Sequence, residues 1–166
     1  MRNLVLIGYM GAGKTTAGAR TAARLGMSFI DTDKYIVRMS HKSINEIFER
    51  YGEGKFRNME YRLCRFLACQ ENLVIATGGG MVVRDENMRC LRADSAVIYL
   101  KGDADILYER AAASGTRPLA ADRGDFLRLL RDREPLYEKY AGVTIDAGRM
   151  PAGELSRRVI SEYLKM

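Results

Sequence analysis

One segment near the N-terminus constrains the fold more than any other. Residues 8–15 read Gly-Tyr-Met-Gly-Ala-Gly-Lys-Thr and satisfy the pattern G-x-x-x-x-G-K-[ST] in full. The apolar run at 4–7 precedes it, and a helical pattern follows from Lys14 to Leu25. Glycines let the backbone form a nest of N–H groups, and a helix that starts there attracts anions. The segment therefore predicts an α/β domain that binds phosphate groups.

The residue types in this segment predict contacts with a nucleoside triphosphate. Lys14 is expected to reach the β and γ phosphates, and Thr15 is expected to place its hydroxyl on Mg²⁺. An ordinary glycine-rich turn before a helix is the alternative, and it explains the full pattern less well. The expected ATP contacts in this segment are Gly11, Ala12, Gly13, Lys14, Thr15 and Thr16.

Strand and helix signals alternate along the rest of the chain. Further strands are expected at 28–31, 73–76, 96–100 and 143–145. Ser43 and Glu46 have the spacing of a capping box, which opens an amphipathic helix. A second apolar helical pattern follows from Phe56, and the last helix is expected to begin near Pro151. This alternation predicts a parallel sheet that is covered by helices on both faces.

Length and composition fit one soluble domain over 1–166. The net charge is +6, but the 27 Lys and Arg are mixed with 21 Asp and Glu and form no basic tail. A solvated surface with an anion-binding cleft is therefore favoured over nucleic-acid binding. The three cysteines form no C-x-x-C pair, which argues against a zinc site. The N-terminal apolar run is too short to span a membrane or act as a signal peptide, so a cytoplasmic protein is expected.

Two acidic residues follow the second expected strand, in the run Asp31-Thr32-Asp33. The carboxyl ends of parallel strands border the ligand crevice. Phosphoryl transfer needs a group that orients the attacking oxygen and accepts its proton. If the backbone stays extended, Asp33 suits that role and Asp31 suits the metal. The alternative, in which one of the two only caps the next helix, remains open.

Seven segments, in order over nearly the whole chain, resemble the shikimate kinase family. Beyond the phosphate loop, which many families share, the combination of D-T-D, G-E-x-x-F-R-x-x-E and G-G-G is far more specific. The segments are Gly8-x-x-Gly11-x-Gly13-Lys14-Thr15-Thr16, Asp31-Thr32-Asp33, Ile44-x-x-Ile47-Phe48, Gly52-Glu53-x-x-Phe56-Arg57-x-x-Glu60, Thr77-Gly78-Gly79-Gly80, Thr116-Arg117-Pro118-Leu119 and Arg133-x-Pro135-Leu136-Tyr137.

The resemblance implies a fold, an activity and a set of partners. The fold would be a three-layer α/β sandwich with a five-stranded parallel sheet, substrate-binding helices at about 32–62 and a mobile lid at about 112–124 of this chain. The activity would be transfer of the γ-phosphate of ATP, with Mg²⁺, to the 3-hydroxyl of shikimate in aromatic amino-acid synthesis. The protein would be a monomer, with no nucleic-acid or membrane partner.

The resemblance also implies roles in acceptor binding. Asp33 would hold the shikimate hydroxyls and assist as a base. Arg57 and Arg133 would bind its carboxylate, and Glu60, at i, i+3 from Arg57, would orient that arginine. Phe56 is expected to face the opposite side of the helix and anchor it. The glycine run, Gly78, Gly79 and Gly80, would line the acceptor, with the last two donating backbone N–H groups.

For the nucleotide, the resemblance implies contacts from three separate segments. Arg117, in the lid, would close over the phosphates and take part in catalysis with Lys14 and Asp33. Arg110 would lie against adenine, and Arg149 and Pro151 would line its other side. Asp31 would sit near Mg²⁺, through water.

Two residues depart from the family pattern. His41 stands where a glycine is common in the turn before the I-x-x-I-F helix, and Ala120 stands where a second leucine is common in the lid. Two other functions remain as alternatives. One is a related kinase that acts on gluconate or a nucleotide, and the other is a non-catalytic module that binds ATP or nucleic acid.

Overall fold

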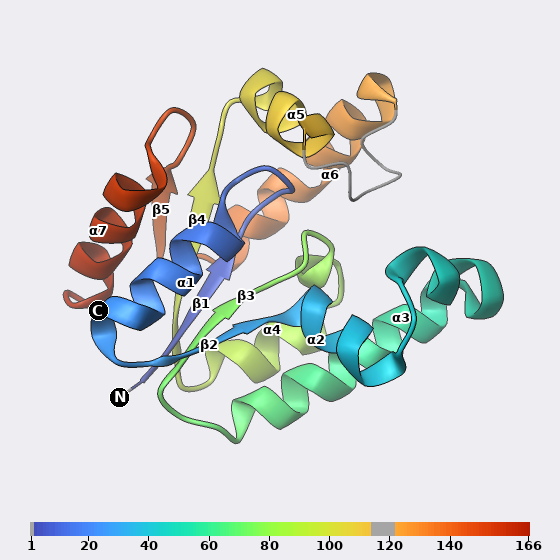
Figure 1. Ribbon diagram of the computed structural model, residues 1–166, viewed down its shortest axis with the longest axis horizontal. Helices are drawn as coiled ribbons and strands as arrows, with labels where there is room; N and C mark the ends of the chain where they lie inside the picture. Colours follow the sequence, from blue (N-terminus) through green and yellow to red (C-terminus); the bar gives the residue numbers. More distant parts are fainter. Residues whose placement is uncertain (1, 114–121) are drawn as a thin grey trace.

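A parallel β-sheet forms the centre of the molecule in the computed structural model (Figure 1). The structure describes residues 2–113 and 122–166. The strand order of the sheet is β2-β3-β1-β4-β5, and every adjacent pair is parallel. All five expected strands are present, with ends that differ by at most one residue. The strands are β1 (Asn3–Ile7), β2 (Ser28–Asp31), β3 (Leu73–Ala76), β4 (Ser95–Lys101) and β5 (Val143–Asp146).

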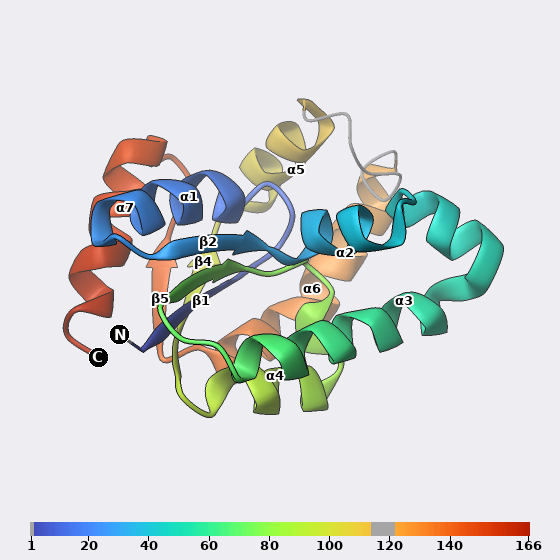
Figure 2. The same ribbon diagram turned by 60° about the horizontal axis from the view of Figure 1, so that its bottom comes forward.

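Helices cover both faces of this sheet, which confirms the expected three-layer α/β sandwich. Figure 2 shows α1 and α7 on one face and α4 and α6 on the other. The described helices are α1 (Lys14–Leu25), α2 (Thr32–Ser40), α3 (Ile44–Ala68), α4 (Asp85–Arg92), α5 (Ala104–Ala113), α6 (Arg123–Tyr140) and α7 (Ala152–Tyr163), with a short 3₁₀ helix, η1 (Met81–Val83). None of the described helices is long and apolar enough to cross a membrane.

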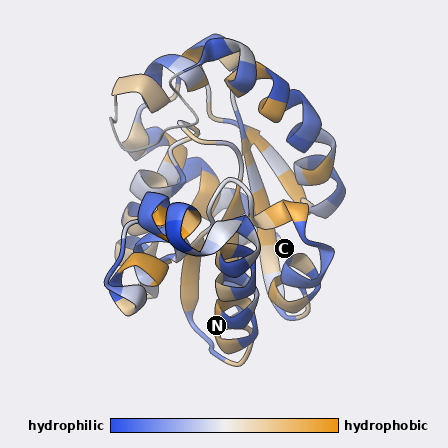
Figure 3. Ribbon diagram, turned by 90° about the vertical axis from the view of Figure 1, so that its right-hand side faces the viewer, coloured by the Kyte–Doolittle hydropathy of each residue, from blue (hydrophilic) through white to orange (hydrophobic). Residues whose placement is uncertain are grey.

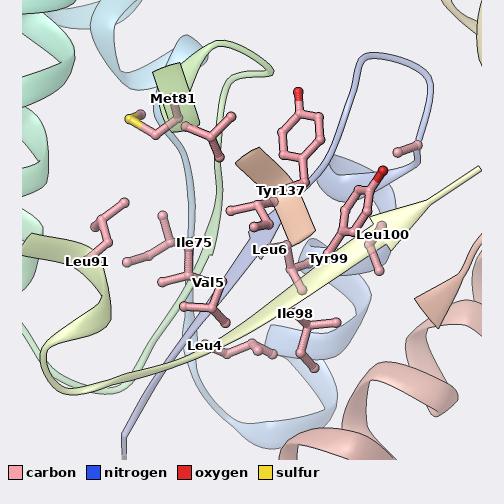
Figure 4. Packing of buried hydrophobic residues seen from close by; sticks show 14 of the residues in the cluster. Leu4, Val5, Leu6, Ile75, Met81, Leu91, Ile98, Tyr99, Leu100 and Tyr137 are labelled. Atoms are coloured by element: carbon pink, nitrogen blue, oxygen red, sulfur yellow. The ribbon is translucent and has the colours of Figure 1, made fainter. Parts of the chain in front are cut away.

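The core lies between the sheet and its two helical layers. Four consecutive residues of β1, from Leu4 to Ile7, are fully buried, as expected for a central parallel strand covered on both faces. Figure 4 shows β1 side chains packed against residues of β3 and β4. Figure 3 shows the same division by hydropathy, with apolar strands inside and mixed helices outside. Burial of these strands sets the carboxyl edge of the sheet as a rigid base for the loops above it.

The chain topology brings two glycine-containing loops together at that carboxyl edge. β1 is the central strand, and its neighbours are β3 on one side and β4 on the other. Ligands of open α/β sheets bind where successive connections leave in opposite directions. The loop after β1 carries residues 8–13, and the loop after β3 carries residues 77–80. The topology therefore places the phosphate loop beside the glycine run.

Helix α3 contains both helices that the sequence predicted in this region, joined across a break. It spans Ile44–Ala68 as one element, but Gly52 interrupts it with a non-helical backbone at φ 76°, ψ 166°. The predicted capping box is present, with Ser43 N donating to Glu46 Oε2 at 2.8 Å and Glu46 N donating to Ser43 Oγ at 3.2 Å. Gly52 thus separates two helical segments that turn relative to each other.

His41 ends helix α2 in a left-handed conformation, with φ 52° and ψ 31°. Glycine is the usual residue at such a helix end because it has no Cβ to clash there. This conformation explains the glycine that the family pattern favours at this position. The histidine is a turn residue in an uncommon backbone region.

A polar cluster joins α4 to the end of α6 and so helps to hold α6 against the sheet. Asp85 Oδ1 accepts from the Tyr140 hydroxyl at 2.5 Å and from Lys139 Nζ at 3.1 Å. Its carboxylate also pairs with Arg89. The Tyr140 hydroxyl, then Lys139, lower the pKa of Asp85 to about 2.

This shift predicts a specific acid sensitivity. Because the folded-state pKa lies below the unfolded value of about 3.9, the contribution of Asp85 to stability is present above that value and is lost as the pH falls towards 2. We expect the difference in unfolding free energy between the native chain and Asp85→Asn to be clear at pH 6 and to shrink steadily below pH 4. Urea unfolding at several pH values measures it. Asp94→Asn, just after α4, is the control, and an equal pH profile for both variants would contradict the prediction.

Candidate functional site

The loop after β1 has the backbone that the phosphate-binding pattern predicted. Gly11 and Gly13 have positive φ values of 82° and 84°. A Cβ at Gly11 would lie 2.3 Å from the carbonyl oxygen of Leu107, so no other residue fits there. Helix α1 begins directly afterwards at Lys14, and its first turn holds no acidic residue. Its positive end is therefore available to an anion.

Lys14 and Thr15 stand at the start of α1 with defined partners. The Lys14 side chain is buried, and its Nζ donates to the carbonyls of Gly8 at 2.7 Å and Tyr9 at 2.8 Å. Its ammonium group is thus held over the loop. Thr15 Oγ1 donates to Asp31 Oδ2 at 2.6 Å, which leaves the oxygen of Thr15 with lone pairs for another ligand.

The structure decides between the two readings of the D-T-D run. The backbone does not stay extended, because α2 begins at Thr32 and Asp31 is its N-cap. Asp31 Oδ1 accepts from the backbone N–H of Lys34 at 3.1 Å while its other oxygen contacts Thr15. Asp31 therefore caps the helix and also reaches the phosphate loop. Asp33 falls in the first turn of α2, on a different face.

Asp33 lies against the glycine run. It is 9% exposed, and a Cβ at Gly78 would approach its Oδ1 to 2.3 Å. The backbone N–H of Gly78 donates to the Thr32 hydroxyl at 2.9 Å, which ties the start of α2 to the loop after β3. Sequence reasoning assigned no role to Thr32. The only sequence feature that pointed to Thr32 was its place in the middle of D-T-D. Its hydrogen-bond partner, Gly78, lies 46 residues away in the sequence.

A cavity of about 380 Å³ brings most of the expected acceptor residues together. Met10 of the phosphate loop forms part of its wall, so the cavity opens beside that loop. Apolar residues of α3 form another part. The lining residues are Met10, Asp33, Ile44, Asn45, Phe48, Glu53, Phe56, Arg57, Glu60, Gly78, Gly79, Gly80, Leu129 and Arg133.

Arg57 is held between two carboxylates on α3. Its Nη1 donates to Glu60 Oε2 at 2.7 Å, which places the expected pair in contact. Its Nη2 and Nε donate to Glu53 Oε1 at 2.7 and 3.0 Å, a contact that sequence reasoning did not assign. A Cβ at Gly80 would lie 2.4 Å from Arg57 Nη1, so glycine is required where the guanidinium meets the loop.

Phe56 anchors the helix as expected, since it is buried in the hydrophobic core, but its expected orientation opposite Arg57 is wrong. Its ring borders the same cavity as Arg57, and the Arg57 guanidinium carbon lies 5.5 Å from the ring centroid. Consecutive helical residues are only about 100° apart, because the helix has 3.6 residues per turn. A long arginine side chain can therefore fold over its neighbour. Phe56 forms an apolar wall of the cavity.

The charged side chains of this cavity differ in how deeply they are buried. Glu60 is 1% exposed, and burial raises its pKa, although the Arg57 guanidinium opposes that rise. The charge of Asp33 raises the pKa of Glu60 further, whereas that of Arg133 lowers it. Arg133 comes from α6, is 9% exposed, and lies 5.8 Å from the centroid of the Tyr9 ring. Two guanidinium groups in a mostly enclosed space suit a small anionic ligand.

A second, more open hollow of about 740 Å³ lies at the ends of β4 and β5. Arg149 and Pro151 both line it, as expected of residues that border one ligand. Arg110 does not line it, and its Nη1 instead donates to the carbonyl of Ala147 at 3.4 Å. Arg117, Ala120 and most of the expected lid at 112–124 lie outside the described residues.

The fold, the phosphate loop and the cavity beside that loop together define the class of protein. A phosphate loop that adjoins an enclosed cavity with a carboxylate and two arginines belongs to a P-loop phosphotransferase, an enzyme that phosphorylates an alcohol group of a small molecule.

The comparisons with known proteins identify the family. The sequence model described as "Shikimate kinase" matches residues 10–164. The shikimate kinase of Pelotomaculum thermopropionicum is 42% identical over 99% of this chain and 96% of its own length. That of Thermodesulfovibrio yellowstonii is 38% identical over 100% and 97%. This chain belongs to the shikimate kinase family.

A solved structure of the family has the same fold. The shikimate kinase from Acinetobacter baumannii, determined in complex with shikimate, is 34% identical and superposes with a TM-score of 0.94. The match covers 99% of this chain and 94% of that chain. The five-stranded sheet expected from the sequence is therefore the sheet of this family.

Proposed function

We propose that this protein transfers the γ-phosphate of ATP to the 3-hydroxyl of shikimate. One observation carries the proposal: Asp33, Arg57 and Arg133, from three helices, border one cavity that opens beside the phosphate loop. The family membership and the solved relative in complex with shikimate support the same acceptor. In the cavity, the Asp33 carboxylate can accept from a ligand hydroxyl, and the guanidinium groups can bind a ligand carboxylate. A hydroxy acid carries both of these groups.

The proposed steps follow from the positions of these side chains. Asp33 accepts a hydrogen bond from the attacking hydroxyl and takes its proton as the phosphoryl group transfers. Arg57 and Arg133 hold the acceptor carboxylate, and Glu60 fixes Arg57. Lys14 lies over the phosphate loop, where its charge balances the transferring group.

Mg²⁺ fits the oxygen donors beside the phosphate loop. Thr15 offers a hydroxyl oxygen, and Asp31, which accepts the proton of that hydroxyl, adds negative charge next to it. We propose that Thr15 binds the ion directly and that Asp31 acts through water. When bound with ATP, the ion neutralises charge that develops between the β and γ phosphates.

For the rest of the nucleotide we propose contacts from Arg110, Arg149 and Pro151, with Arg117 closing over the phosphates. The hollow lined by Arg149 and Pro151 supports the adenine position. We further propose that the protein works as one domain, as a monomer in the cytoplasm, without a nucleic-acid partner. These proposals follow the family pattern and the mixed charge distribution of the chain.

A coupled assay of ADP release tests the function directly. Shikimate as sole acceptor should give ATP- and Mg²⁺-dependent turnover, and gluconate should give none. Turnover with gluconate but not with shikimate would assign the related sugar-acid activity instead. ATP binding without acceptor-dependent ADP release would favour a non-catalytic module.

Arg57 provides a second test, aimed at the acceptor site. We expect Arg57→Lys to raise the KM for shikimate by about 10-fold or more, because lysine loses the two-pronged contact with a carboxylate. The KM for ATP should change by less than about twofold. Lysine is preferred to alanine because an unpaired, buried Glu60 would cost about 3–5 kcal/mol of stability. Steady-state kinetics with each substrate varied in turn measure both values.

The matched control for this test is Arg62→Lys. Arg62 lies on the same helix, is exposed, and does not line the cavity. Its variant should leave both KM values unchanged. An unaltered shikimate KM in Arg57→Lys would remove Arg57 from acceptor binding.

A further inference from the structure

The hydroxyl of Tyr137 is buried one helical turn beyond Arg133 on α6. It donates to the carbonyl of Gly79 at 2.5 Å, and the tyrosine side chain is fully buried. Its ring stacks on Tyr99 with 5.0 Å between centroids, and Figure 4 shows the two rings side by side. Tyr137 therefore links a core aromatic pair to the glycine run that lines the acceptor cavity.

The contact at the Gly79 carbonyl also constrains the direction of the neighbouring Gly80 N–H. The Gly79 carbonyl and the Gly80 N–H belong to one peptide unit, which is trans because the described residues contain no cis bond. In a trans unit the two groups point in opposite directions. Since the Tyr137 hydroxyl holds the carbonyl, it also fixes the direction of the Gly80 N–H, away from Tyr137. Within the described part of the chain, no backbone or side-chain group accepts that N–H.

The glycine run needs such a restraint because its neighbours leave no room for side chains. A Cβ at Gly78 would collide with Asp33, and one at Gly80 would collide with Arg57. Glycine fits both contacts but has the freest backbone of all residues. Thr32 restrains the run at the Gly78 N–H, and Tyr137 restrains it at the Gly79 carbonyl.

Tyr137 is also a helical neighbour of Arg133. The two residues are four apart on α6 and so share a face of the helix. Burial raises the pKa of Tyr137, and the charge of Arg133 acts in the opposite direction. The phenol stays protonated and donates to the Gly79 carbonyl. The same helix face therefore carries both an arginine of the cavity and the hydroxyl that holds the glycine run.

We propose that Tyr137 is a positioning residue for the acceptor: its hydroxyl holds the Gly79 carbonyl so that the Gly80 N–H faces the acceptor from a fixed direction. This inference rests on the proposed shikimate kinase activity. It assigns Tyr137 to acceptor binding and not to the nucleotide, although the glycine run also lies close to the phosphate loop.

The test is Tyr137→Phe, which removes one oxygen and keeps the ring. We expect the KM for shikimate to rise by about 10-fold, because the buried Gly79 carbonyl loses its partner and the Gly80 N–H loses its fixed direction. The KM for ATP should change by less than about twofold. Tyr99→Phe is the matched control, since it makes the same change in the stacked ring, and no described residue hydrogen-bonds that hydroxyl. Its two KM values should match those of the native chain.

Several outcomes would overturn the inference. A shikimate KM in Tyr137→Phe equal to that of Tyr99→Phe would do so, as would an equal rise in both KM values, which would indicate general loosening. If the native chain shows no turnover with shikimate, the proposed function fails and this inference fails with it. If the native chain turns over shikimate and Tyr137→Phe has an unchanged KM for shikimate, only this inference is contradicted and the proposed function stands.

A measurement on the native protein covers the case in which Tyr137→Phe does not fold. The backbone amide proton of Gly80 should shift downfield in the NMR spectrum when shikimate is added without nucleotide, because it gains an acceptor. The amide of Gly26, at the end of α1 and outside the cavity, is the reference. A Gly80 signal that moves no more than that of Gly26 would contradict the proposed direction of the N–H.

Discussion

Replacement of Lys14 by methionine should abolish phosphoryl transfer, with turnover reduced by at least about 10³-fold. Methionine is similar in length and apolar, so the change removes the charge and the hydrogen bonds of the ammonium group but keeps most of the side-chain volume. The ammonium group of Lys14 is held at 2.7 and 2.8 Å by two carbonyls of the phosphate loop. In that position its charge lies where the phosphates of ATP are expected. Initial rates of ADP release at saturating shikimate measure the effect.

Lys34→Met is the control for this prediction. Lys34 also lies in the first part of a helix that follows a strand, but its side chain is exposed and outside both cavities. Its variant should keep nearly full activity. If Lys14→Met retained more than about a tenth of the native rate, the charge of Lys14 would not be needed for transfer.

Asp33→Asn should lower kcat by at least about 10²-fold while the affinity for ATP stays close to that of the native chain. Asparagine has almost the same shape and can still hydrogen-bond a hydroxyl, but it cannot accept its proton. The substitution also removes a negative charge that raises the pKa of Glu60. Glu60 is then more readily ionised and continues to hold Arg57, so shikimate binding should be weakened far less than turnover.

Steady-state kinetics with both substrates varied, together with ATP binding by calorimetry, separate these effects. Asp132→Asn on α6 is the control, because Asp132 is exposed beside Arg133 but does not line the cavity. Near-normal turnover in Asp33→Asn would remove Asp33 from the proton transfer. A large loss of ATP affinity would indicate instead that the variant disturbs the phosphate loop.

Local patterns predicted the elements that depend on neighbouring residues. The phosphate loop, the capping box at Ser43 and the strand at Leu73–Ala76 were all recognised, because each is specified within about ten residues. The expected contact between Arg57 and Glu60 was also right, since helical spacing alone brings i and i+3 together. The predicted orientation of Phe56, opposite Arg57, was wrong because helical spacing does not determine how far an arginine side chain folds over its neighbour.

Other features depended on contacts between distant segments. The dual contact of Asp31 required both the start of α2 and the side chain of Thr15. The exact place of the break, at Gly52, became visible only from its backbone angles, because the two predicted helical patterns left it unspecified between Tyr51 and Phe56. Tyr137 stood in a recognised motif, yet its partner Gly79 lies 58 residues away in sequence. No local pattern reports a hydrogen bond of that kind.

The amino-acid sequence alone determined that this chain has alternating strands and helices, a phosphate loop and the side chains of a small-molecule kinase. These properties follow from backbone preferences and from hydrophobic periods that act over a few residues. Only the tertiary structure decided that Asp33, Arg57 and Arg133 border one cavity and that Tyr137 reaches the glycine run. Those contacts arise where three layers pack at one edge of the sheet, and packing between layers depends on the whole chain at once.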